Sequence, residues 1–168
     1  MAVTENAPTN KWVHFFVDDY QFERLWNFPK RYLGLLKRFQ GVITPDFSMY
    51  QTMPKAQQIW NCYRSRALAY WFQSNDIDIV PVVEWAEYSD LDWCLDGLPS
   101  HSTLAIGAYG CNKTKLARYG FIKGVEKICN TLMPEAIVIY GKEIKSINSL
   151  CKNVIWEENY CKTIKMRL

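Results

Sequence analysis

The feature that most constrains the fold is a short apolar run that ends in two carboxylates. Residues 13–17, Val-His-Phe-Phe-Val, are mostly apolar and lead directly into Asp18 and Asp19. A short apolar run bounded by polar residues is typical of a strand that is buried on both faces, as in a parallel sheet. The carboxyl ends of such strands form the edge where open α/β sheets bind ligands. The run therefore predicts a parallel sheet with acidic side chains at its ligand-binding edge.

The same arrangement recurs along the chain, where strands alternate with helices. Apolar runs predict strands at 12–17, 41–44, 77–83, 103–108, 136–139 and 154–156. Helical spacing of apolar residues predicts helices at 22–39 (with a break near Pro29), 55–74, 89–98 and 116–132. Such alternation is typical of parallel strands joined by right-handed crossovers. We therefore expect an α/β fold with about six mostly parallel strands, as an open sheet or an incomplete β/α barrel.

Length and composition fit one folded domain. The 168 residues are 49% hydrophobic and 15% aromatic, which excludes disorder for most of the chain. We expect a flexible N-terminal arm over 1–11, which is polar at its start, and a single α/β domain over 12–168. The sequence shows no signal peptide and no apolar run that could cross a bilayer. Its six cysteines contain no C-x-x-C pair, which indicates a reduced, cytoplasmic protein without a membrane partner.

Charge and motifs exclude several classes of function. The net charge of +3 is too small to indicate a nucleic-acid partner by itself, although 142–168 contains six basic side chains. No Walker or G-x-G-x-x-G loop is present, so ATP hydrolysis and dinucleotide chemistry are not expected. Neither His14 nor His101 stands near a recognised nucleophile pattern, which argues against a hydrolase triad.

Acidic residues follow successive predicted strands and form the candidate site. Asp19, Asp46 and Glu84 each follow an apolar run, and we expect them to be catalytic residues at a common edge. Three converging carboxylates can bind a divalent cation through oxygen ligands, so the same three acids are the candidate metal ligands. They can instead act as general acid and base if burial separates their pKa values. The expected substrate-binding residues are Asn61, Arg64, Arg66, Trp85, Tyr109 and Tyr140.

Structural explanations of these residues stay open beside the functional ones. A single Asp after a strand often caps the next helix, which applies to Asp18, Asp19 and Asp46. Arg66 on a mostly apolar helix face can form a buried structural ion pair. Aromatic residues at strand ends are often core rings with one exposed edge.

Several segments together resemble a family of uncharacterised bacterial and phage proteins, known as a domain of unknown function. The resemblance is carried by 13–26 (VHFFVDDYQFERLW), 45–50 (PDFSMY), 61–66 (NCYRSR) and 79–85 (IVPVVEW). It covers most of the chain and implies a phage, prophage or plasmid setting, and hence the cytoplasm of a host cell. It implies no mechanism. Many members of the family are longer than this chain.

Three classes of function follow from these observations. The first is an enzyme that acts on a nucleotide or nucleic acid through the carboxylate-rich edge, with Arg64 binding phosphate. The second is a non-enzymatic factor that binds and inhibits or redirects a host protein, such as a defence protein, through exposed aromatic and Arg side chains. The third is a protein that sequesters a nucleotide-like ligand at the same edge. The recurrence of acids at equivalent strand ends favours the first.

Overall fold

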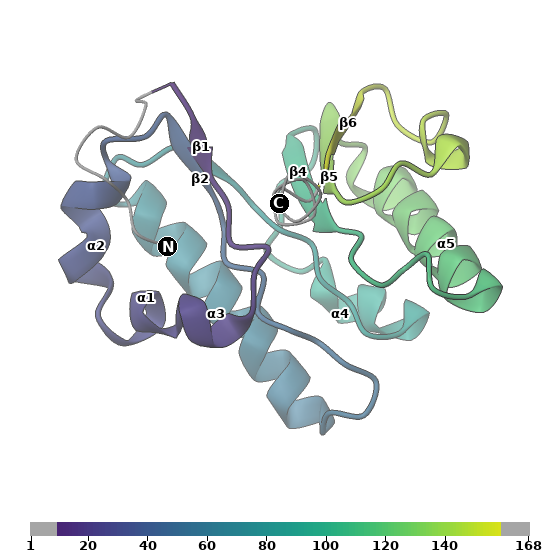
Figure 1. The fold of residues 1–168 in the computed structure, drawn as a ribbon, viewed down its shortest axis with the longest axis horizontal. Coiled ribbons are helices and arrows are strands. Elements are labelled where there is room, and N and C mark those ends of the chain that lie inside the picture. The colour runs from purple at the N-terminus through teal and green to yellow at the C-terminus, as the bar shows by residue number, and fades with distance from the viewer. Residues whose placement is uncertain (1–9, 159–168) are drawn as a thin grey trace, which may run out of the picture. The chain divides into compact units, whose positions relative to one another are not determined.

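The chain forms an α/β fold with six parallel strands (Figure 1). The computed structural model describes residues 10–158, so most of the predicted arm at 1–11 and the end of the basic segment at 142–168 lie outside the described residues. Within 10–158 every strand pairing is parallel. This confirms the α/β class and the parallel strands expected from the sequence. The strands divide between two open sheets of three strands each.

The division of the sheets matches a division of the chain into two compact units, which meet between Ala86 and Glu87. Each unit has its own parallel sheet, and each is described below by itself. The sequence analysis expected one domain over 12–168. The single domain over 12–168 stays a prediction.

The first unit contains three helices and a sheet in the order β1-β2-β3. Its elements are β1 (Trp12–Val13), α1 (Glu23–Asn27), α2 (Pro29–Leu36), β2 (Gly41–Ile43), α3 (Lys55–Gln73) and β3 (Ile79–Val80). The predicted break falls where α1 ends and Pro29 begins α2, as expected from a residue that suits a first helical turn. The core gathers apolar side chains from the sheet, the loop after β2 and all three helices, among them Phe22, Val42, Phe47 and Phe72.

The strands of the first sheet are shorter than the apolar runs predict. β3 ends at Val80 because Pro81 has no N–H to donate to the ladder. The ladder is continued by a side chain, since the Val82 N–H donates to Oγ1 of Thr44 at 2.9 Å. Beyond this point the chain runs irregularly to Glu84. The apolar residues of 77–83 are buried, as expected, but only part of this segment pairs as a strand.

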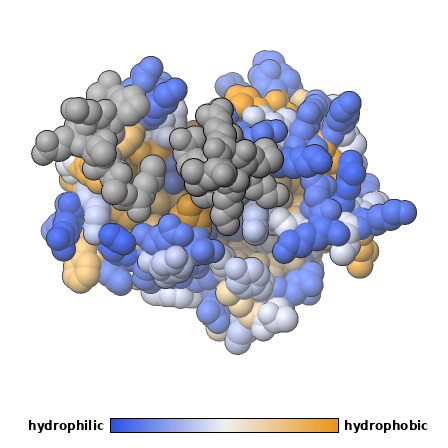
Figure 2. Space-filling view, viewed as in Figure 1, coloured by the Kyte–Doolittle hydropathy of each residue, from blue (hydrophilic) through white to orange (hydrophobic). Residues whose placement is uncertain are grey.

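The second unit carries the sheet β4-β5-β6. Its elements are α4 (Leu91–Cys94), β4 (Thr103–Gly107), α5 (Lys115–Leu132), β5 (Ala136–Tyr140) and β6 (Val154–Glu157). α5 begins at Thr114, whose hydroxyl accepts from the Ala117 N–H at 3.0 Å. In Figure 2 hydrophilic side chains predominate over α5, while its other side buries Val125 and Ile128.

Two further expectations concern the cell compartment. Among residues 10–158, Cys62, Cys94, Cys111, Cys129 and Cys151 form no disulfide. Among residues 10–158 no helix combines the length and the hydropathy that crossing a bilayer requires.

Candidate active site

The first sheet brings three predicted acids to one edge. β1, β2 and β3 are parallel, so their carboxyl ends face the same side of the sheet. Asp19 follows β1, Asp46 follows β2 and Glu84 follows β3. Their charges act on one another, because Asp19 raises the pKa of Asp46 and Asp46 raises the pKa of Glu84. The edge is therefore a cluster of interacting carboxyls.

Asp46 titrates near neutral pH. Burial of its carboxyl raises the pKa from 3.8 to about 7, and the neighbouring Asp19 charge adds to this shift. The residue as a whole is partly exposed to solvent. A carboxyl with this pKa can both donate and accept a proton at pH 7.

Glu84 is a buried acid without hydrogen-bond partners. The residue is 6% exposed, and neither Oε atom has a hydrogen-bond partner among the described residues. Burial holds the pKa of Glu84 well above its usual value, and the Asp46 charge raises it further. The guanidinium of Arg66 opposes this shift, but it does not cancel it. Its burial therefore favours the protonated form of Glu84, which is the less costly state for a buried carboxyl.

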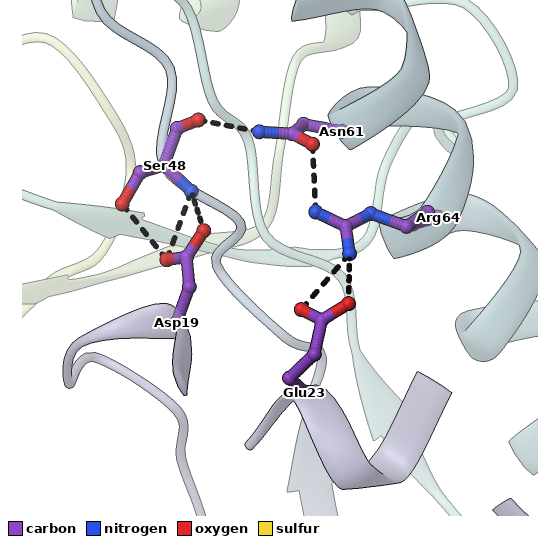
Figure 3. Close-up of polar contacts among 5 residues, drawn as sticks. All are labelled: Asp19, Glu23, Ser48, Asn61 and Arg64. Carbon is purple, nitrogen blue, oxygen red and sulfur yellow. Dashed lines mark hydrogen bonds and ion pairs between the residues drawn. The ribbon is translucent and has the colours of Figure 1, made fainter. Parts of the chain in front are cut away.

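A chain of polar contacts fixes Asp19 to the loop after β2 and to two helices (Figure 3). The carboxylate of Asp19 accepts from the Ser48 hydroxyl at 2.8 Å and from the Ser48 N–H at 3.1 and 3.2 Å. The Ser48 carbonyl accepts from Nδ2 of Asn61 at 2.7 Å. Nη2 of Arg64 donates to Oδ1 of Asn61 at 2.7 Å, and Nη1 donates to the Glu23 carboxylate at 2.7 and 3.0 Å.

These contacts make Asn61 and Arg64 positioning residues. Arg64 is 8% exposed, and its guanidinium carbon lies 3.8 Å from the centre of the Phe47 ring, a close cation–π contact. With Glu23, Asn61 and Phe47 around it, the guanidinium holds α1, α3 and the loop after β2 together. Arg66, on the same helix, donates to the Val82 carbonyl at 2.9 Å. Its charge lowers the pKa of Glu84.

The predicted aromatic site residues divide between the two units. Trp85 directly follows Glu84 and is half-buried. Tyr109 and Tyr140 stand at the carboxyl ends of β4 and β5, which belong to the second sheet. Tyr109 is 76% exposed and Tyr140 is 7% exposed. The cluster of acids is thus assembled from the first unit, and the roles of Tyr109 and Tyr140 as substrate-binding residues stay predictions.

The helix-cap explanation does not describe Asp19. The 3-10 helix at Asp19–Gln21 has Asp18 at its N-cap position without a side-chain cap bond, and the Asp19 carboxylate is directed to Ser48 instead. Asp46 is followed by an irregular loop before α3, so it precedes no helix directly.

A shared metal site is not formed by these acids as they stand. Among residues 10–158 no group of three or more His, Cys, Asp and Glu side chains is arranged to hold a metal ion. Asp19 already uses both carboxylate oxygens for Ser48. The roles of Asp19, Asp46 and Glu84 as metal ligands or as general acid and base stay predictions.

The sequence analysis missed Glu23, Phe47 and Ser65 as parts of this cluster. Glu23 is 41 positions from its partner Arg64, and no local pattern predicts such a pairing. Ser65 donates to the Pro45 carbonyl at 2.9 Å and lies close enough to Glu84 to lower the pKa of its carboxyl. The only available signal for Ser65 was the polar run at 61–66, in which Asn61, Cys62, Arg64 and Ser65 are buried and Tyr63 is exposed.

Comparison with known proteins identifies the family of this chain. The pattern of a family described as a domain of unknown function (DUF4417) matches residues 2–157. The chain belongs to this family. The match includes every residue of the acid cluster and confirms the resemblance found in the sequence.

Two phage proteins are similar to this member of the family. The Gene 1 protein of Mycobacterium phage L5 is 39% identical over 130 residues, which are 77% of this chain and 57% of that protein. The Gene 1 protein of Mycobacterium phage D29 is 36% identical over 130 residues, which are 77% of this chain and 48% of that protein. The chain thus spans about half the length of these relatives, and the phage setting is confirmed. No solved structure matches the chain.

Proposed function

We propose that this chain is a phage enzyme that cleaves the bond between base and sugar in a nucleotide or nucleic acid, by acid–base catalysis without a metal. The observation that carries the proposal is the half-exposed Asp46, with a pKa of about 7, beside the Asp19 carboxylate. A carboxyl that holds its proton near neutral pH, next to a second carboxylate, is the arrangement used for glycosidic bond cleavage.

The roles of the acids follow from their surroundings. Asp46 donates its proton to the leaving base nitrogen as the C–N bond breaks. Asp19, held by Ser48, stabilises the positive charge that develops on the sugar. Water then adds to the sugar carbon and returns a proton to the Asp46 carboxylate. Glu84 is a positioning residue, because its oxygens are inaccessible to solvent and its carboxyl interacts with that of Asp46.

The activity is tested with a panel of nucleosides, nucleotides and oligonucleotides in the presence of EDTA. We expect release of free base, measured by chromatography, and a loss of at least about 100-fold with Asp46→Asn, because general acid catalysis contributes about 10²–10⁴-fold. The matched control is Asp78→Asn, an exposed acid just before β3, which should keep full activity. Base release that survives Asp46→Asn, or release of phosphate without free base, would contradict the proposal.

A second measurement does not depend on the choice of substrate. The carboxyl ¹³C resonance of Asp46 should titrate with a midpoint of about 7, while that of Asp78 serves as the exposed reference. An Asp46 midpoint in the ordinary range for an aspartate, about 3.5–4, would remove the basis for its role as general acid.

A further inference from the structure

The helix α3 has reversed polarity over its first three turns. Its inner side buries polar residues, since Gln58 and Asn61 are 2% exposed and Arg64 is 8% exposed. Its outer side carries large rings, with Trp60 47% and Tyr63 56% exposed. A helix on a protein surface normally has the opposite pattern. Exposed rings at successive turns of such a helix indicate a binding surface.

The exposed rings form an ordered platform together with Trp26 of α1. Trp60 and Tyr63 are nearly parallel, at 25° and with ring centres 5.5 Å apart. Trp26 packs with its ring nearly perpendicular to both, at 5.4 Å from Trp60 and 6.2 Å from Tyr63. Because Trp26 supports the pair from below, the two rings are held in one orientation in the absence of a ligand. We call Trp26, Trp60 and Tyr63 the ring platform.

The helices that carry the ring platform, α1 and α3, contain more basic than acidic side chains. Residues 22–73 contain eight Lys or Arg and two Asp or Glu, although the whole chain has a net charge of only +3. The two acids are compensated, because Glu23 pairs with Arg64 and Asp46 has a raised pKa. The exposed basic residues of this segment include Arg24, Lys30, Arg31 and Lys55, while Lys37 is paired with Asp76.

We infer that the ring platform binds single-stranded nucleic acid by stacking its bases on Trp60 and Tyr63. Proteins that bind single strands combine basic surfaces with exposed aromatic rings, because every base has a π face to stack. A duplex keeps its bases stacked inside and cannot use such a platform. A protein partner would also use exposed rings, but it would not by itself explain the excess of positive charge.

The ring platform and the acid cluster are built on the same helix. Tyr63 stands between Cys62 and Arg64 in the sequence, and Cys62 is one of the groups that raise the pKa of Glu84. Asn61, next to Trp60, is bonded to the loop that carries Asp46 and Ser48. The inference deepens the proposed function by naming a single strand as its substrate class, and it rests on that function for the role of the bound strand.

Binding is measured by fluorescence anisotropy with a labelled 20-nucleotide DNA, an RNA of the same length and a DNA duplex. We expect the single strands to bind more tightly than the duplex, with affinity falling as the salt concentration rises. Trp60→Ala and Tyr63→Ala should each weaken binding at least about fivefold, since stacking contributes about 1–3 kcal/mol per base. Trp60→Phe, which keeps a ring, should bind more tightly than Trp60→Ala.

The matched control is Tyr119→Ala, which removes a ring that is 61% exposed on α5 and should leave affinity unchanged. Base release is measured in parallel for each ring variant, which separates loss of binding from loss of catalysis. Circular dichroism confirms that each variant is folded. Unchanged affinity in both ring variants, preference for the duplex or no binding at low salt would overturn the inference. Retention of a host protein that requires Trp60, without oligonucleotide binding, would replace it with a protein-docking surface.

Discussion

At the scale of single residues, the acid cluster holds carboxyls in surroundings that oppose their charge. Asp46 and Glu84 each have a raised pKa because burial penalises the ionised form. Groups of this kind reduce stability and are found where a function requires them. Arg66 only partly offsets the cost at Glu84. The cluster is therefore better explained by chemistry than by structural support.

The stability of the chain should depend on pH through Asp46. Between about pH 4 and pH 7 the folded state retains a proton on Asp46 that the unfolded state has lost. Because the folded state binds more protons there, the free energy of unfolding should fall as pH rises through this window and level off above it. The shift corresponds to at most about 4 kcal/mol, less the screening that partial exposure allows.

Urea unfolding at a series of pH values measures this effect as a difference between variants. Asp46→Asn lacks the titrating group, so its stability relative to the wild type should improve steadily from pH 4 to pH 7. Asp78→Asn, which changes an exposed acid, should follow the wild-type curve. Parallel curves for Asp46→Asn and the wild type would show that Asp46 titrates normally.

At the scale of elements, one glycine allows the first sheet to form. A Cβ on Gly41 would lie 2.8 Å from the Asp78 carbonyl oxygen and would overlap the Trp12 ring. Gly41→Ala should therefore destabilise the chain by about 1–3 kcal/mol, as overpacking does in other cores. Gly34, inside α2, has no atom within 4 Å of its added Cβ. Gly34→Ala should instead stabilise by about 0.5–1 kcal/mol, and thermal melting distinguishes the two outcomes.

The elements also show how far the sequence predicts this structure. Apolar runs and helix signals, such as Pro29 and the approach to α3 at Pro54, predicted the alternation of strands and helices and the carboxyl-end position of Asp19, Asp46 and Glu84. Local patterns could not predict that six strands would form two sheets, because strand pairing depends on contacts distant in sequence. The same limit hid the bonds of Asp19 to Ser48 and of Glu23 to Arg64, which join residues 29 and 41 positions apart.

Helix periodicity was misleading at α3 for a physical reason. The sequence shows apolar and polar residues at helical spacing, and the natural expectation is that Tyr63 and Tyr70 face the core. The structure exposes both rings and buries Asn61 and Arg64, because these polar groups satisfy each other through Ser48 and Glu23. Polarity alone does not decide which face is buried when a polar network is complete.

At the scale of the whole molecule, the chain has two compact units with separate sheets. We therefore predict that the units unfold in separate steps. Phe72 is fully buried in the core of the first unit, and Phe72→Ala should destabilise that unit by about 3–5 kcal/mol. Hydrogen exchange followed by mass spectrometry should then show faster exchange in peptides before Ala86, with little change after Glu87. Equal acceleration on both sides would support the single domain expected from the sequence.

The polar network of α3 also restricts how this helix can roll about its own axis. A roll that moved Trp60 and Tyr63 inward would carry Asn61 and Arg64 outward. It would break their bonds to Ser48 and Glu23 and leave the Glu23 carboxylate without its counter-ion. The internal hydrogen bonds therefore oppose rotation of the helix. They keep the two rings at the surface, although burial of the rings would be favoured by the hydrophobic effect.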